Sequence, residues 1–170
     1  MALIWAAVFE HEFIFFSYHP LFNSLAVLLF VQGVLVLQPT ATQKDKITGA
    51  YVHAALNTSA VALAIAGLVI IEENKASHPE TRFQSVHGKL ALVAYILIFI
   101  QWSIGAALFF LQGTVIDVDR AKSVYKYHRY VYMYTLWLGA VGLIVEQNFR
   151  LRDSSISTCC CGGSHNHGLQ

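Results

Sequence analysis

Four histidines recur at the same place in the hydropathy pattern of the chain. Each begins a long apolar run, and they lie in "SYHP", "YVHA", "SVHG" and "KYHR" as His19, His53, His87 and His128. An ionisable side chain is costly at the edge of a hydrocarbon layer, and imidazole is the commonest metal ligand among protein side chains. The recurrence therefore predicts that these four side chains bind a metal centre.

The apolar runs that follow the histidines are long enough to cross a bilayer. The chain has 170 residues, of which 56% are hydrophobic and 12% are charged. Its mean hydropathy is +0.53. A helix of about 20 apolar residues matches a hydrocarbon core roughly 30 Å thick. The sequence predicts an all-α, polytopic membrane helix bundle with spans at residues 19–37, 49–71, 86–112 and 127–147.

The segments outside the spans are short. Residues 1–18 contain an apolar stretch too short to cross a membrane, so we expect the end of a truncated extra N-terminal helix followed by a loop. Residues 19–147 form the expected four-helix core. Residues 148–170 form a polar Cys/His tail whose composition predicts disorder. Because the net charge is only +1 and no long basic block exists, we expect no nucleic acid partner.

The tail contains a compact group of metal-binding residue types, "CCCGGSHNH". The adjacent cysteines Cys159 to Cys161 provide no disulfide framework for the apolar body. With His165 and His167 they have the chemistry to bind a soft metal, and cysteines close to a membrane are candidates for palmitoylation. A tail without a specific function is the simplest interpretation.

Membrane topology sorts the four histidines into two pairs. Successive helices run in opposite directions, so His19 and His87 lie near one surface, and His53 and His128 lie near the other. Two imidazoles that face each other at one depth of a helix bundle are an axial pair for a haem iron. Zinc needs four ligands at one point, which makes a metal transporter the weaker interpretation. We expect two haem groups near opposite surfaces, since 14 residues of helix span roughly 21 Å.

Small residues follow each histidine on the same helical face. They recur seven and fourteen positions later, and 14 residues complete nearly four helical turns. The positions are Ala26, Ala60, Ala94 and Thr135, then Gly33, Gly67, Gln101 and Gly142. We expect the small side chains to leave room for a flat macrocycle, with each glycine accommodating the haem held by the other pair. Close packing of membrane helices on small residues is the alternative.

At these residues the chain resembles the cytochrome b561 family of trans-membrane di-haem reductases. The matching motifs are "SYHP", the histidine that opens the second span, "TRFQSVHGKLAL" and "YKYHRY", within roughly residues 4–147. The resemblance implies six helices, of which the central four carry the haem ligands in the pairs His19 with His87 and His53 with His128. "MALIWAAVF" then corresponds to the end of the first family helix, and the sixth has no counterpart in this sequence.

The resemblance also implies an activity. Family members take an electron from cytosolic ascorbate and deliver it across the membrane to monodehydroascorbate or ferric iron, so we expect an ascorbate-dependent reductase with two haem b groups. In the family, the side that bears His53 and His128 is cytoplasmic. Cations on that side favour an anionic donor, although they also suit lipid phosphates. The candidate donor contacts are Lys126, Lys122 and Arg129, and the candidate acceptor contact on the opposite side is His78.

Two other functions stay open at this point. One is a haem-binding assembly or regulatory subunit without turnover, which reduction by the donor would distinguish from an electron carrier. The other is a metal-ion transporter, which needs polar residues deep along a path, and the middles of the spans offer few. We expect an integral, multi-pass membrane protein in contact with lipid. The sequence does not determine its organelle, its acceptor or its assembly, for example as a homodimer.

Overall fold

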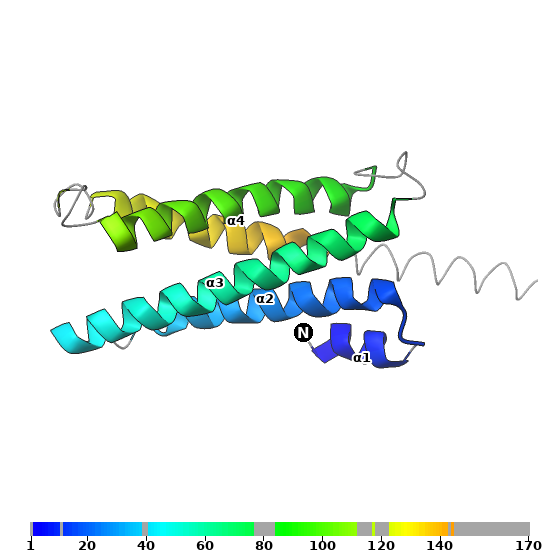
Figure 1. The fold of residues 1–170 in the computed structure, drawn as a ribbon, viewed down its shortest axis with the longest axis horizontal. Helices are drawn as coiled ribbons and strands as arrows, with labels where there is room; N and C mark the ends of the chain where they lie inside the picture. Colours follow the sequence, from blue (N-terminus) through cyan, green and yellow to red (C-terminus); the bar gives the residue numbers. More distant parts are fainter. Residues whose placement is uncertain are drawn as a thin grey trace, which may run out of the picture.

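Helices make up nearly all of the described chain. The computed structural model describes residues 2–10, 12–38, 41–76, 84–111, 117, 123–142 and 144. This part of the chain contains no β-strand, and its helices lie side by side in an elongated bundle (Figure 1). The predicted all-α fold class is therefore confirmed.

The long helices follow the apolar runs of the sequence. The elements are α1 (Ala2–Glu10), the 3-10 turn η1 (Phe15–Ser17), α2 (Tyr18–Leu35), α3 (Gln43–Asn74), α4 (Val86–Leu111) and a further helix over residues 123–142, called helix 123–142 below. Within the described ranges, three helical segments are long and apolar enough to cross a membrane: Phe15–Leu35, Gln43–Asn74 and Val86–Leu111. The prediction of an integral, multi-pass membrane protein is confirmed.

Two helix ends differ from the apolar runs for identifiable reasons. Helix α3 begins at Gln43, six residues before the predicted span, because Thr42 and Asp45 form a reciprocal capping box. The Asp45 backbone N–H donates to Thr42 Oγ1 at 3.1 Å, and the Thr42 backbone N–H donates to Asp45 Oδ2 at 3.0 Å. Residues 112, 143 and 145–147 of the predicted third and fourth spans lie outside the described residues.

The short helix α1 lies beside α2 and agrees with the expected extra N-terminal helix. The indole Nε1–H of Trp5 donates to Ser24 Oγ at 2.8 Å. Ser24 is only 1% exposed, so this hydrogen bond satisfies a hydroxyl in the interior. The division of the chain into residues 1–18, 19–147 and 148–170 stays a prediction, and the tail lies outside the described residues.

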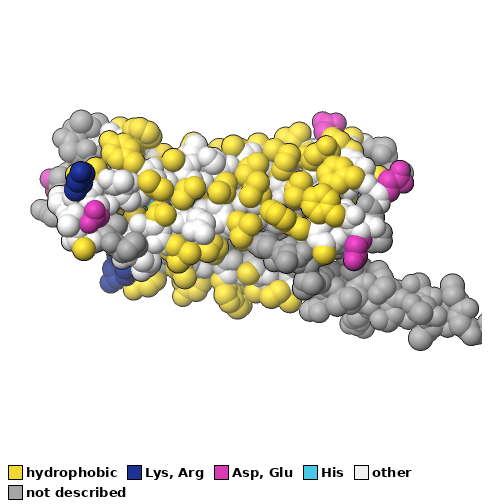
Figure 2. Space-filling model, turned by 90° about the horizontal axis from the view of Figure 1, so that it is seen from below, with side chains coloured by type: hydrophobic (Ala, Val, Ile, Leu, Met, Phe, Trp, Pro, Cys, Tyr) yellow, Lys and Arg dark blue, Asp and Glu magenta, His cyan; other side chains and the backbone are white. Residues whose placement is uncertain are grey.

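The antiparallel order of the helices gives the bundle two distinct ends. Helix α3 and helix 123–142 begin at the end where α4 finishes, whereas α2 and α4 begin at the end where α3 finishes (Figure 1). His53 and His128 therefore belong to one end, and His19 and His87 to the other, as the topology predicts. Seen from below, the surface is apolar along its length, and the coloured charged side chains gather near both ends (Figure 2).

Helix α3 packs more extensively against α2 than against α4. A cluster of buried side chains joins α2 and α3 to Tyr132 of helix 123–142, and its members on α2 and α3 are Ala26, Phe30, Ala60, Val61 and Ala64. Nearer the ends, Gly33 and Gly67 each face an asparagine of the neighbouring helix. A Cβ atom at Gly33 would lie 2.5 Å from Asn57 Nδ2, and one at Gly67 would lie 2.6 Å from Asn23 Nδ2. These two glycines therefore allow the close approach of α2 and α3.

We expect Gly33→Ala and Gly67→Ala each to lower the free energy of unfolding by roughly 1–3 kcal/mol, because the new methyl group overpacks the α2–α3 contact. Denaturant titration of the purified protein in detergent, followed by circular dichroism, measures this change. Gly142→Ala is the matched control, since a Cβ atom there would meet nothing within 4 Å. Equal stability of all three variants would contradict the proposed role of the two glycines.

Candidate cofactor sites at the two ends of the bundle

The face that carries the histidines is the inner face of the bundle. All eight positions that lie seven or fourteen residues after a histidine are buried. The four histidines are half-buried, which fits side chains near the ends of helices whose middles lie inside. The helical period of the sequence thus correctly identified one continuous interior surface.

Helices α2 and α3 anchor each other's histidines. His19 on α2 donates a hydrogen bond from Nδ1 to the carbonyl oxygen of Gly67 on α3, at 2.8 Å. His53 on α3 donates from Nδ1 to the carbonyl oxygen of Gly33 on α2, at 2.6 Å. Each glycine lies 14 positions after the histidine of its own helix and accepts the hydrogen bond from the histidine of the other helix. The arrangement is reciprocal, so one antiparallel register positions both imidazoles.

The second helix pair repeats this contact once. His87 on α4 donates from Nδ1 to the carbonyl oxygen of Gly142 at a longer 3.3 Å. Gln101, the position equivalent to the glycines, instead donates from its side-chain amide to the carbonyl oxygen of His128. Among the described residues, His128 Nδ1 and Gln101 Oε1 are buried without a hydrogen-bond partner. The fourth histidine is therefore held differently from the other three.

These hydrogen bonds determine which nitrogen of each anchored ring can bind a metal. A carbonyl oxygen only accepts, so the Nδ1 that bonds to it must carry the proton. In the neutral form of such a ring, the lone pair that can bind a metal is then on Nε2. Histidines that bind metals usually donate their other N–H in this way, which fixes the tautomer and raises the basicity of the ligand. His19, His53 and His87 are thus prepared as ligands through Nε2.

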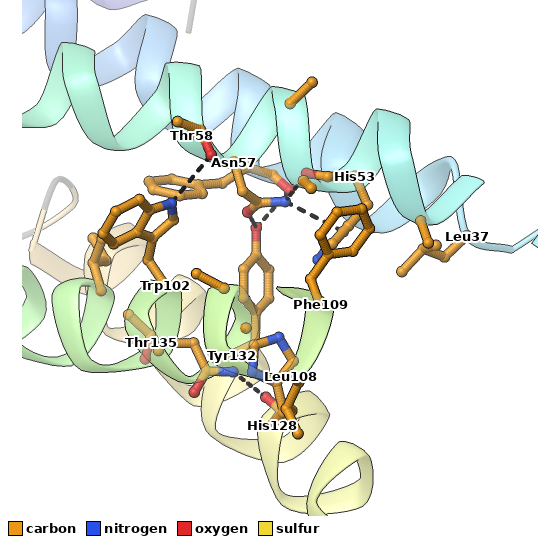
Figure 3. A pocket seen from close by; sticks show the side chains of 18 of the residues that line it. Leu37, His53, Asn57, Thr58, Trp102, Leu108, Phe109, His128, Tyr132 and Thr135 are labelled. Atoms are coloured by element: carbon orange, nitrogen blue, oxygen red, sulfur yellow. Dashed lines mark hydrogen bonds between the residues drawn. The ribbon is translucent and has the colours of Figure 1, made fainter. Parts of the chain in front are cut away.

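His53 and His128 line one cavity between the two helix pairs (Figure 3). The cavity has a volume of about 800 Å³, within the range of cofactor pockets. Most of its lining is apolar and comes from α2, α3, α4 and helix 123–142. The ring of Tyr132 lies beside that of His53, with 6.3 Å between ring centroids. One predicted pair is thus brought to a common apolar space.

Gly105 on α4 gives the His128 ring its place at this cavity. A Cβ atom at Gly105 would lie 3.0 Å from Cε1 of His128, closer than an ordinary van der Waals contact. Gly105 itself lines the cavity. Any side chain at this position would press on the ring, so the glycine is part of the site.

His19 and His87 lie at the opposite end, on helices joined by one polar bridge. Tyr95, two turns after His87, donates from its hydroxyl to Oδ1 of Asn23, one turn after His19, at 2.6 Å. This hydrogen bond turns the histidine-bearing faces of α4 and α2 toward each other. The ring of Phe16 stacks on that of His19, with 5.8 Å between centroids.

Two asparagines and two tyrosines beside the histidines were missed by the sequence analysis. Asn23 and Asn57 each lie four residues after a histidine, and Tyr95 and Tyr132 bond to them from the other helix pair. A signal existed in the sequence. The pattern His, Asn four positions later and Gly ten positions after that occurs twice, as "HPLFNSLAVLLFVQG" and "HAALNTSAVALAIAG", with an offset of 34 residues.

The predicted substrate contacts do not line this cavity where the structure describes them. Lys126 and Arg129 are exposed on helix 123–142, and the Arg129 guanidinium lies over the ring of Tyr130 at 5.7 Å from its centroid. Neither residue is among those that line the cavity at His53 and His128. Lys122, His78 and the cysteine-bearing tail lie outside the described residues, so those predictions are not tested.

Comparison with known proteins shows the family of the chain. The family described as eukaryotic cytochrome b561 matches residues 18–149, which include all four histidines. The chain belongs to the eukaryotic cytochrome b561 family. Within the described residues no group of three or more His, Cys, Asp or Glu side chains could share one metal ion. The pairing of the four histidines stays a prediction.

Curated relatives are similar to this cytochrome b561 family member at low identity. The protein named transmembrane ascorbate-dependent reductase CYB561 from Pongo abelii is 26% identical over 144 residues, covering 81% of this chain and 56% of the relative. The protein of the same name from Homo sapiens is 26% identical over 128 residues, covering 75% and 49%. The chain therefore spans about half the length of these relatives. No solved structure matches it.

The residues present fit the haem b that membership of the cytochrome b561 family implies. A haem is a flat, largely apolar group whose iron takes axial imidazoles. The cavity at His53 and His128 is of cofactor size, its walls are mainly apolar, and the anchored His53 presents Nε2. At the other end, His19 is likewise anchored through Nδ1, and the ring of Phe16 stacks on its ring.

We expect Gly105→Val to displace the His128 ring and to reduce the haem content of the purified protein, by up to half in the two-haem arrangement that the sequence predicts, because the ring lines the cofactor-sized cavity. The pyridine haemochrome absorbance per chain measures the content. Ser103→Val places the same side chain at an exposed position of α4 and is the control. Unchanged haem content and an unchanged optical spectrum in Gly105→Val would show that α4 does not confine His128.

Proposed function

We propose that this chain carries single electrons across a membrane, from a donor such as ascorbate to ferric iron or monodehydroascorbate, with two haem b groups as cofactors. The axial ligands in this proposal are His19 with His87 at one end and His53 with His128 at the other. Each haem, when bound, supplies a one-electron couple whose reduction potential depends on its ligands and surroundings.

The observation that carries the proposal is the matched anchoring of histidines at both ends of one bundle. His19 and His53 are fixed by equivalent bonds to Gly67 and Gly33, and these two levels are 14 residues of helix apart, or roughly 21 Å. Ligation of both faces of an iron leaves no open coordination position for oxygen or substrate. This favours electron transfer over oxygen chemistry.

The chain's own residues provide position and a dry interior. The buried cluster around Phe30, Ala60 and Tyr132 occupies the space between the two histidine levels. Polar groups there are paired, since the Tyr132 hydroxyl lies within hydrogen-bond distance of Phe30 O and Asn57 Oδ1. These paired polar groups hold the helices in a fixed relation.

The donor and acceptor belong to different ends in this proposal. Ascorbate is an anion that gives up one electron and one proton to become monodehydroascorbate, and ferric iron takes one electron to become ferrous iron. The proposed donor contacts are Lys126 and Arg129 on helix 123–142, together with Lys122, which directly precedes this helix in the sequence, because their charges attract an anion. His78, nine residues before His87 in the sequence, is the proposed acceptor contact.

We expect the purified protein to hold two haem groups per chain and to be reduced substantially by ascorbate before dithionite completes the reduction. His53→Ala and His87→Ala should each lose about one haem, since each removes a ligand of a different site. Haem per chain and reduced-minus-oxidised spectra measure both effects. His78→Ala is the matched control, expected to keep two haems.

Other outcomes would point to other functions. Two haems without reduction by ascorbate would favour a haem-binding subunit without turnover. A chain that binds no haem would overturn the ligand assignment and would favour a metal-ion transporter. Haem that survives both His53→Ala and His87→Ala would also contradict the assignment.

We expect Lys126→Ala to raise the KM for ascorbate several-fold with little change in haem content, because it removes a positive charge near the proposed donor entry. The rate of haem reduction, measured by stopped-flow absorbance against ascorbate concentration and salt, tests this. Lys89→Ala removes an equal charge from the opposite end and is the control. If both variants behave alike, Lys126 is not a donor contact.

A further inference from the structure

Asn23 and Asn57 occupy equivalent positions behind two of the histidines. Asn23 Nδ2 donates to the carbonyl oxygen of His19 at 2.9 Å, and Asn57 Nδ2 donates to that of His53 at 2.7 Å. The same amide nitrogens lie 3.3 Å and 3.2 Å from Nδ1 of these rings. Because Nδ1 already donates to a glycine carbonyl, this second approach is a packing contact between two donors.

Each asparagine also packs against the glycine whose carbonyl oxygen accepts the hydrogen bond from its histidine. The glycine whose carbonyl oxygen accepts from His53 is Gly33, and a Cβ atom there would lie 2.5 Å from Asn57 Nδ2. The same relation joins His19, Gly67 and Asn23. Asn57 is 7% exposed, so little water reaches this point. The asparagine amide thus offers Nδ1 no acceptor, and the glycine carbonyl accepts its proton.

A tyrosine from the opposite helix pair fixes each asparagine. The Tyr95 hydroxyl of α4 donates to Asn23 Oδ1 at 2.6 Å. The Tyr132 hydroxyl of helix 123–142 lies 2.9 Å from Asn57 Oδ1 and 2.7 Å from Phe30 O, and it shares one proton between them (Figure 3). These contacts orient each amide so that its nitrogen faces the histidine.

We propose that Asn23 with Tyr95, and Asn57 with Tyr132, are positioning pairs that set the redox potential of the two haem sites independently. The proposal rests on the proposed function, because it assigns a role toward the haem ligands His19 and His53. A stronger hydrogen bond from Nδ1 to its acceptor makes the imidazole a more basic ligand through Nε2, which stabilises the oxidised iron. The asparagine amide places a donor beside Nδ1, so the glycine carbonyl alone strengthens the ligand in this proposal.

The test is the isosteric change Asn23→Asp or Asn57→Asp in the haem-loaded protein. The new carboxylate presents an acceptor oxygen where the amide nitrogen lies beside Nδ1, so we expect the ratio of oxidised to reduced haem at that site to rise at least tenfold at fixed potential. For one electron this equals about 59 mV. Spectroelectrochemical titration and electron paramagnetic resonance of each ferric signal measure the two sites separately.

The proposal requires each variant to change the potential of one haem site only. Asn23→Asp should shift one of the two components of the redox titration, and Asn57→Asp should shift the other. Asn74→Asp makes the same chemical change at an exposed position near the end of α3 and controls for charge alone. Unmoved potentials in both variants, or a shift equal to that of Asn74→Asp, would overturn the proposal.

Tyr95→Phe and Tyr132→Phe keep the proposal testable if an aspartate variant loses haem. Each removes one hydroxyl and preserves the ring, so we expect a smaller shift confined to the same component. Unchanged potentials in both would overturn the proposal. Failure of the proposed function has a different signature, because the wild-type chain would then hold no haem or would not be reduced by ascorbate.

Discussion

The structure depends on hydrogen bonds from histidine Nδ1 to the backbone carbonyls of facing helices. A helix carbonyl already accepts an N–H within its own helix, and its second lone pair is reached only if the neighbouring helix comes close. Gly33 and Gly67 make that approach possible on α2 and α3. The antiparallel register is then constrained by two bonds at once, His19 to Gly67 and His53 to Gly33. A slip by one turn would break both.

The contacts within each helix pair and the space between the two pairs have different roles. Anchoring takes place within a pair, either α2 with α3 or α4 with helix 123–142, whereas the proposed ligand nitrogens serve the space between pairs. The cavity at His53 and His128 is lined by residues from all four helices. Tyr132 joins the two pairs beside this cavity, and Tyr95 joins them at the opposite end. In the proposal above, each tyrosine therefore acts on a histidine of the other helix pair, through the asparagine that it contacts.

The helices and their inner face could be predicted from the sequence, because the length of an apolar run and the helical period are properties of single helices. Contacts between helices could not be predicted, because they depend on how each helix is rotated against its neighbours. Gly33 and Gly67 were expected to make room for a haem, but the structure fills their space with Asn57 and Asn23. Tyr132 also looked like one of several tyrosines in "YKYHRYVYMY". Only the three-dimensional arrangement distinguishes the hydroxyl that reaches Asn57.

The departure at Gln101 explains why the second helix pair differs from the first. At the position equivalent to Gly33, Gly67 and Gly142, this residue carries a side chain, and its amide bonds to the backbone of His128. The ring of His128 meets α4 one turn further along, at Gly105, and no carbonyl accepts from its Nδ1 among the described residues. The close contact between α4 and the His128 helix therefore lies at Gly105, one turn beyond Gln101. His53 carries the backbone anchor at this end, while His128 is confined by shape.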